Sequence, residues 1–246
     1  MDKKVHLSSR FDYVISFLKW PAAWLAAILT PFLAWAFLNL VARVVTSPLA
    51  IVPFAGGTFF FIILWRKWLG ASRYGRFLIT LEHESTHALF ALITWHRIVG
   101  FRASLGRGGE VRFTGKGNWL ITAAPYFFPT AALLLFVIAY IMPFPGLPWQ
   151  SFLLGVALGY HIISTYKETH RDQSDLKDLG STFCWMFLPA ANLAVVGLLM
   201  SFAHGASEGL GVWFADIGRP FEWIWPFADL GLDANGMGDN PVGSDE

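Results

Sequence analysis

Apolar residues occur along this chain in long continuous runs, not in the short periods of a soluble amphipathic helix. A helix that crosses a bilayer needs about 20 mostly apolar residues. Stretches of this length or somewhat shorter recur between polar segments. They are Trp20–Val45, Leu49–Trp65, Tyr74–Trp95, Leu120–Met142, Ser151–Tyr166 and Ser181–Phe202. The pattern predicts an all-α polytopic membrane protein with five to six transmembrane or membrane-inserted helices.

The pattern changes after the third apolar stretch, where the chain reads GFRASLGRGGEVRFTGKGN. This segment is rich in glycine and in basic residues. Its two halves, Val99–Leu105 and Glu110–Thr114, flank the sequence GRGG. Two short strand-like runs around a glycine-rich turn predict a short β-hairpin.

The chain from Gly205 onward is acidic, with eight Asp and Glu residues and one basic residue, Arg219. The segment VWFADIGRPFEWIWPF is rich in Trp and Phe, which favour the headgroup boundary of a bilayer. The last residues are polar and glycine-rich, which is typical of disorder. We therefore expect an N-terminal pair of transmembrane helices (1–70), a membrane core (71–203), and an interfacial Trp-rich segment with an acidic disordered tail (204–246).

Composition strengthens the membrane interpretation. Only 14% of the residues are charged and the mean hydropathy is +0.49, whereas a soluble domain carries about a quarter charged residues. The lipid bilayer is therefore an expected partner, and the net charge of +1 argues against a nucleic-acid partner. Cys184 is the single cysteine, which excludes disulfides within the chain and a Cys-rich metal site. The polar N-terminus gives no expectation of a cleavable signal peptide.

Basic residues indicate how the chain is oriented, because Lys and Arg concentrate on the cytoplasmic side. If Tyr74–Trp95 enters the membrane and returns, 16 of the 18 Lys and Arg residues lie on one face, all but Arg43 and Arg219. If the same segment crosses fully, the split becomes nine to nine. The charge rule favours the first arrangement and places the hairpin on the cytoplasmic side.

The third apolar stretch contains the sequence HExxH, formed by His83, Glu84, Ser85, Thr86 and His87. Residues i and i+4 of a helix lie on one face, so both imidazoles can bind one tetrahedral Zn²⁺. Glu84 can then act as general base toward a water molecule whose pKa the metal lowers to about 7. Ionisable groups inside an apolar segment are costly and usually functional. The motif therefore predicts a zinc site.

A catalytic zinc needs a third protein ligand. Ionisable candidates cluster at and after the fifth apolar stretch. They are His161, Glu168, His170, Asp172, Asp175 and Asp178. A lone histidine inside an apolar span is more often a packing residue than a ligand, which counts against His161. Ser174 is the expected N-cap of a helix that follows, and the aspartates also suit the positive end of its dipole.

Between Tyr74 and Phe202 the chain resembles the site-2 protease group, the intramembrane zinc metalloproteases of peptidase family M50, and most closely the M50B-like branch. The HExxH helix, the glycine-rich hairpin and a later Asp-bearing segment, QSDLKDLG, follow in the family's order. The segment ITAAPYFFPTAAL resembles the family's A-G-P-x-x-N segment, with Ala123, Ala124 and Pro125 in its first three places and Phe128 in place of its Asn.

The resemblance implies specific roles. His83 and His87 would be zinc ligands, and Glu84 the general base and acid. An aspartate after the later span would be the third ligand. Asp175 is the first choice and Asp172 the second, although the family's L-D-G sequence around this aspartate is absent.

The function implied is hydrolysis of peptide bonds in membrane-embedded protein substrates, in a bacterial inner (plasma) membrane. A substrate helix must unwind locally to expose its carbonyls, and the hairpin could pair with the unwound strand or serve only as a connector. Two alternatives remain open, a non-proteolytic assembly or regulatory protein with the same fold, and a zinc hydrolase acting on a lipid-linked substrate. A di-iron desaturase is disfavoured, because that class needs about eight histidines and this chain has seven. The sequence leaves the oligomeric state open.

Overall fold

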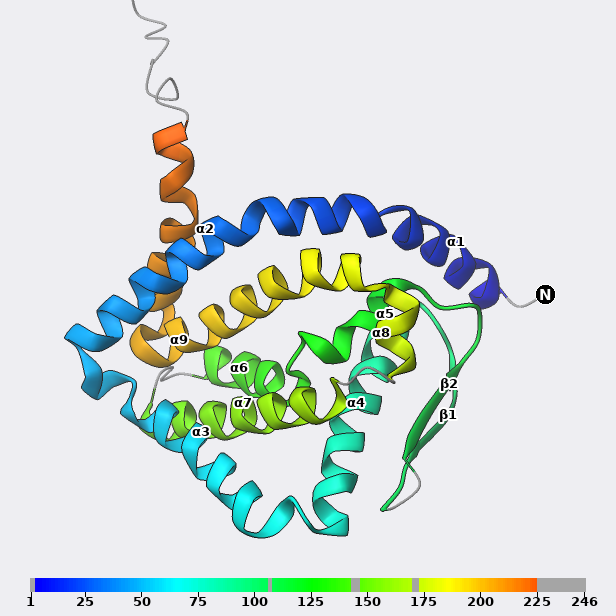
Figure 1. Cartoon of the computed structure of the whole chain (residues 1–246), viewed down its shortest axis with the longest axis horizontal. Helices are drawn as coiled ribbons and strands as arrows, with labels where there is room; N and C mark the ends of the chain where they lie inside the picture. The colour runs from blue at the N-terminus through cyan, green and yellow to red at the C-terminus, as the bar shows by residue number, and fades with distance from the viewer. Residues whose placement is uncertain (1–2, 106–107, 143–146, 170–172, 225–246) are drawn as a thin grey trace, which may run out of the picture.

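A computed structural model describes residues 3–105, 108–142, 147–169 and 173–224. Almost all of this chain is helical (Figure 1). The helices are α1 (Lys3–Phe17), α2 (Lys19–Thr46), α3 (Val52–Leu64), α4 (Arg73–Ile93), α5 (Trp119–Ala123), α6 (Thr130–Ile141), α7 (Pro148–Glu168), α8 (Ser174–Leu179) and α9 (Ser181–Ile224). Shorter turns are η1 (Pro48–Ala50), the π-helical η2 (Trp65–Leu69) and η3 (Ala124–Tyr126). The predicted disordered tail lies outside the described residues.

Two helices of the described chain are long and apolar enough to cross a membrane. They are α2 and the Ser181–Pro220 part of α9. The fourth predicted stretch is broken. Trp119–Tyr126 and Thr130–Ile141 meet at 81° and form a third candidate only if the bent pair counts as one span. The structure thus supports a helical membrane protein with two or three spans, and the larger number of five to six remains a prediction.

The β-hairpin is present where the sequence predicts it. Strands β1 (Ile98–Ala103) and β2 (Gly109–Phe113) pair antiparallel, with Arg102 opposite Glu110. In Figure 1, α4 runs crosswise to α7 and the hairpin extends alongside α4. The HExxH helix and the hairpin therefore lie together at one end of the bundle.

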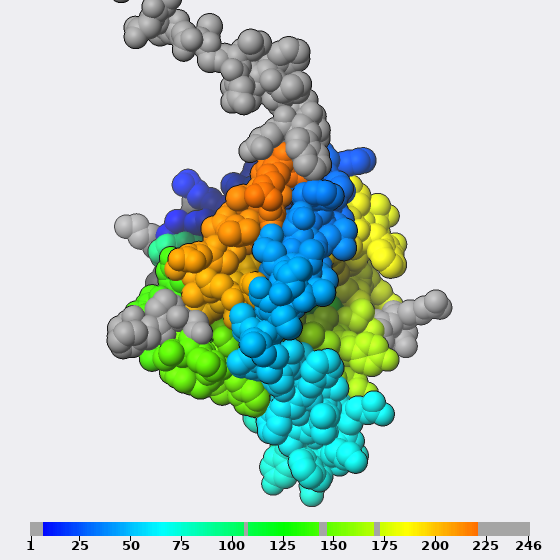
Figure 2. Space-filling model, turned by 90° about the vertical axis from the view of Figure 1, so that its left-hand side faces the viewer, coloured from blue at the N-terminus to red at the C-terminus, as the bar shows by residue number. Residues whose placement is uncertain are grey.

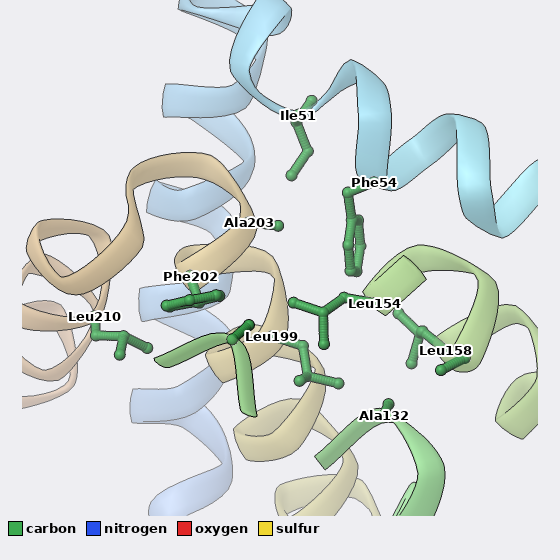
Figure 3. Close-up of a cluster of buried hydrophobic side chains, with 11 residues drawn as sticks. Ile51, Phe54, Ala132, Leu154, Leu158, Leu199, Phe202, Ala203 and Leu210 are labelled. Atoms are coloured by element: carbon green, nitrogen blue, oxygen red, sulfur yellow. The ribbon is translucent and has the colours of Figure 1, made fainter. Parts of the chain in front are cut away.

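Glycine residues bring α3 and α7 into close contact. A Cβ atom at Gly155 would overlap the carbonyl oxygen of Phe54, and one at Gly57 would overlap that of Phe152. Small residues at such positions let membrane helices approach closely, where packing and not water exclusion drives association. Figure 3 shows the apolar cluster beside this contact, where Phe54 and Leu154 lie near Leu199.

The N-terminal α2 packs along α9, and Figure 2 shows α2 beside the C-terminal half of α9. The chain leaves helical geometry at Gly205 and Ala206. Trp213, in the segment that the sequence places at the interface, is only 1% exposed and packs against Gly197.

Asp216, which is fully buried, accepts hydrogen bonds from two arginines, Arg43 on α2 and Arg219 on α9. These are the two basic residues that the charge rule assigns to the opposite face. The buried carboxylate of Asp216 therefore forms ion pairs with both arginines, since a buried charge needs a partner.

The α3–α7 contact predicts the effect of adding one methyl group. Gly155→Ala should lower the thermal stability of the purified protein by about 1–3 kcal/mol, because overpacking forces the two backbones apart. Gly56→Ala is the matched control, because a Cβ at Gly56 meets nothing within 4 Å. Thermal unfolding in detergent measures both. Equal stability of the two variants would contradict the packing account.

Candidate metal centre

Helix α4 presents the two motif histidines on one face. The helix begins at Ser72, whose hydroxyl accepts a hydrogen bond from the amide N–H of Gly75 at 2.9 Å and caps its first turn. His83 and His87 are one turn apart, and their Nε2 atoms lie 3.1 Å from each other. His83 is buried. Local helix geometry alone accounts for this pair.

Asp175 completes the group from a distant part of the chain. It lies in the first turn of α8, and its Oδ2 is 3.1 Å from Nε2 of His87 and 3.4 Å from Nε2 of His83. Among the described residues, these three side chains form a group whose ligand atoms lie close enough to hold one metal ion. The structure thus brings together the first-choice aspartate and both motif histidines.

The chemistry of these three donors fits a divalent metal. Nδ1 of His87 lies 2.8 Å from the carbonyl oxygen of Ile121. A carbonyl can only accept, so Nδ1 carries the proton and Nε2 of the neutral ring presents a lone pair. That lone pair faces a carboxylate oxygen and a second imidazole nitrogen. Tetrahedral zinc with bonds of about 2.0–2.1 Å would place its ligand atoms about 3.3 Å apart, close to the separations observed.

Asp175 is held in its ionised form. Burial opposes ionisation, but when no metal is bound and the His83 and His87 rings are protonated, their hydrogen bonds and charges outweigh it, so the pKa of this carboxyl lies well below its usual range. An ionised carboxylate is the form that binds a metal ion.

The carbonyl that orients His87 belongs to α5, and this helix is fixed at its start by Asn118. The Asn118 side-chain oxygen accepts a hydrogen bond from the amide N–H of Ile121 at 3.3 Å. Its side-chain amide in turn donates to Asp12 on α1, at 2.9 Å. A chain of hydrogen bonds therefore links α1 to the metal-facing His87 through α5.

Asp12 also holds the base of the hairpin. Its carboxylate lies 3.1 Å from Nε2 of His96, a residue that is 2% exposed and lies two residues before the start of β1. Nδ1 of His96 lies 3.0 Å from the hydroxyl of Thr94, at the end of α4. Helix α1 thus fixes both the hairpin and α5. The sequence prediction did not single out Asp12, Asn118 or His96. The one available signal is Asn118, since an Asn directly before an apolar run is a typical N-cap.

Glu84 lies in a cavity of about 450 Å³ that also contains the three converging side chains. Strand β2 forms one wall of this cavity through Gly109, Glu110 and Val111. The backbone at Gly109 approaches Glu84 so closely that a Cβ there would overlap the Glu84 side chain. Glu84, the candidate general base, therefore lies between the edge of the hairpin and the three side chains that could bind a metal ion, which we call the metal group (His83, His87 and Asp175).

The other candidates in the described part of the chain lie outside the group formed by His83, His87 and Asp175. His161 faces Glu82, with Nδ1 and Oε1 3.8 Å apart, in agreement with a packing role. Glu168 lines the site cavity, where Gln173 donates a hydrogen bond to it. Asp178 lines a neighbouring cavity. His170 and Asp172, the second-choice ligand, lie outside the described residues.

The prediction that Ser174 caps α8 is wrong. Gln173 occupies the N-cap position without a side-chain cap, and Ser174 is the first residue of the helix. The Gln173 side chain is engaged instead with Glu168. Helix α8 begins one residue earlier than Ser174 capping requires, and this start places Asp175 in its first turn.

The segment that resembles A-G-P-x-x-N forms the break between α5 and α6. Ala123, Ala124 and Pro125 are buried there, and the ring of Tyr126 lies edge-on to His83 with centroids 5.7 Å apart. Phe128, at the position of the family's Asn, packs against Phe90 with centroids 4.9 Å apart. Its side chain contributes to packing on α4.

Comparison with known proteins gives one match. Residues 54–165 match the sequence model of the Peptidase M50B-like family. Searches of curated proteins and of solved structures gave no match. The matched segment starts within α3, earlier than the resemblance at Tyr74, and it ends before Asp175. It contains the HExxH helix, the hairpin and most of α7, and over these residues the chain is similar to the Peptidase M50B-like family.

Proposed function

We propose that this protein is an intramembrane zinc metalloprotease of the site-2 protease type, which hydrolyses peptide bonds of membrane-protein substrates. One observation carries the proposal. His83, His87 and Asp175 converge within bonding distance of a single ion, beside Glu84 and in a cavity walled by a strand edge. The match of residues 54–165 to the sequence model of the Peptidase M50B-like family supports the same function.

Each residue of the site has a defined task in this proposal. When bound, Zn²⁺ would supply a Lewis acid that polarises the scissile carbonyl and lowers the pKa of water. Glu84 accepts the proton of the attacking water and returns it to the leaving amide nitrogen. The Ile121 carbonyl keeps the proton of His87 on Nδ1, which leaves Nε2 free to bind.

The hairpin supports binding of an extended substrate. A peptide in a helix has its carbonyls hydrogen-bonded, so a substrate must unwind before hydrolysis. Strand β2 pairs with β1 on one side, and its residues Gly109–Val111 line the cavity. An unwound segment that added to this edge would bring its backbone past Glu84 and the metal group.

The arrangement of α4 supports the orientation that the charge rule favours. Because α4 runs crosswise to α7 (Figure 1), the basic segment before it and the hairpin after it lie at one end of the bundle. We therefore propose that this end is cytoplasmic, in a bacterial inner membrane, and that water reaches the site from there.

Metal analysis of the purified protein tests the site. About one Zn²⁺ per chain is expected in the wild type and in Glu84→Gln, because Glu84 is not a ligand. Asp175→Asn should lose most of the metal, since an amide is a far weaker ligand than a carboxylate. Asp172→Asn is the matched control and should retain it. Retention in Asp175→Asn together with loss in Asp172→Asn would identify Asp172 as the ligand instead.

The hydrogen bonds behind His87 predict a weaker but measurable effect. Asn118→Ala should lower Zn²⁺ affinity about tenfold, because groups that orient a ligand contribute about 10–100-fold to metal affinity. The double variant Asp12→Asn, Asn118→Asp exchanges the two side chains. The carboxylate at position 118 can accept from the Ile121 N–H and from the amide at position 12, so the double variant should recover most of the lost Zn²⁺ affinity. Competition with a chelator measures both. Equal affinity of Asn118→Ala and the wild type would show that Ile121 is positioned by other contacts.

Activity is tested by looking for substrates that persist. Cells that carry Glu84→Gln should accumulate uncleaved membrane proteins that the wild type removes, because the general base is lost while the metal site remains. Quantitative membrane proteomics compares the two strains. Identical membrane proteomes under several growth conditions would favour a regulatory protein over a protease.

A further inference from the structure

Three cavities adjoin one another along β2. The central one, of about 450 Å³, contains the metal group. A second, of about 370 Å³, shares Thr80, Gly108 and Glu168 with it. A third, of about 300 Å³, shares Phe113, Ile121 and Thr122. Because Gly108 directly precedes β2 and Phe113 ends it, the three cavities form one groove that follows the strand.

Charge alternates along this groove. The cavity at the Gly108 end contains Arg76 and Lys167, and the cavity at the Phe113 end contains Lys19 and Lys116. Each end also has one carboxylate, which leaves a net positive charge at both. These carboxylates are Glu168 and Asp178. The centre is acidic apart from its metal ligands, through Glu84 and Glu110.

The basic groups at the two ends are available to a ligand. Arg76, Lys167 and Lys116 are exposed, and within the described chain none of them has an ion-pair partner. Lys19 donates one hydrogen bond, to the carbonyl oxygen of Leu179, and an ammonium group has three donors. By contrast, Arg102 and Arg112 of the hairpin both lie near Glu110.

We propose that the groove selects an extended peptide segment with an acidic residue at each end and no acidic residue at its centre. The proposal rests on the function proposed above and specifies its substrate. Strand β2 spans five residues, and extended chains rise about 3.3 Å per residue. The two acidic positions are therefore separated by about six residues. Acidic side chains at the centre would meet Glu84 and Glu110.

An anionic lipid headgroup is the other ligand that basic residues near a membrane attract. The groove favours a peptide for two reasons. Its two basic ends lie on either side of an acidic centre, and the strand edge between them offers backbone hydrogen bonds that a headgroup lacks.

Peptide binding tests the selection. The full-length Glu84→Gln protein in phosphatidylcholine nanodiscs is titrated into three fluorescent peptides of equal length. One has Asp at both ends of a six-residue stretch, one has Asn there, and one has Asp at the centre. The first peptide should bind about fivefold more tightly than the second, as two exposed ion pairs allow. The third should bind most weakly, because the Glu110 carboxylate is still present at the centre of the groove in this variant. Added salt should reduce the preference.

Variants of the basic residues test whether the preference for the peptide with Asp at both ends arises in the groove. Lys116→Gln combined with Lys167→Gln should abolish it. Arg73→Gln removes an equally exposed charge from α4 that lines none of the three cavities, and should leave it intact. Equal affinity for all three peptides, or an equal loss in Arg73→Gln, would overturn the proposal.

Three further outcomes are separable. If phosphatidylglycerol in the nanodiscs displaces the acidic peptide and removes the preference, the ends are headgroup sites and the proposal is overturned. Wild-type protein that cleaves all three peptides equally would contradict the selection but leave the protease function standing. Selective binding without any cleavage would leave the selection standing and contradict the protease function.

Discussion

Two imidazole nitrogens and a carboxylate oxygen converge within 3.1–3.4 Å of one another, and this arrangement suits a shared cation. The Ile121 carbonyl fixes the proton of His87 on the far side of its ring, so Nε2 meets Asp175 and His83 as an acceptor. The three atoms lie at about the edge length of a zinc tetrahedron, and a cation between them would offset the repulsion between their lone pairs. The group lies beside Glu84 and the edge of β2, where a bound cation could polarise a substrate carbonyl.

The rest of the fold positions this group. Helix α4 supplies two ligands by its own periodicity, but α8 must be brought to it from almost ninety residues away along the sequence. The glycine contacts between α3 and α7 fix α7, and α7 leads into the short connection to α8. On the other side, Asp12 fixes α5 through Asn118 and the hairpin through His96. Helix α1 lies outside the family-matched segment, yet it holds both walls of the site.

Charge placement divides the molecule in a consistent way. The two arginines expected on the opposite face share Asp216, while exposed basic groups surround the metal cavity at the hairpin end. A hydrolytic site near a membrane needs water and an extended substrate, and both are easier to supply at the polar end of a bundle than at its apolar centre. The crosswise course of α4 places the HExxH sequence at that polar end.

The sequence alone determined what depends on local periodicity and composition. It predicted the His83–His87 pair, because residues i and i+4 share a helix face, and the hairpin, because glycine-rich turns separate short strand-like runs. It also predicted membrane helices, because their hydropathy is a local property. Tertiary structure decided what depends on contacts between distant segments. Asp175 was the first choice through the family resemblance, but only the fold shows that it lies beside both histidines. Ser174 was expected to be the N-cap, a position that Gln173 occupies. The break near Pro125 interrupts an apolar run that hydropathy joins. The supporting hydrogen bonds of Ile121, Asn118 and Asp12 join three elements that have no common local pattern, so only the fold brings them together.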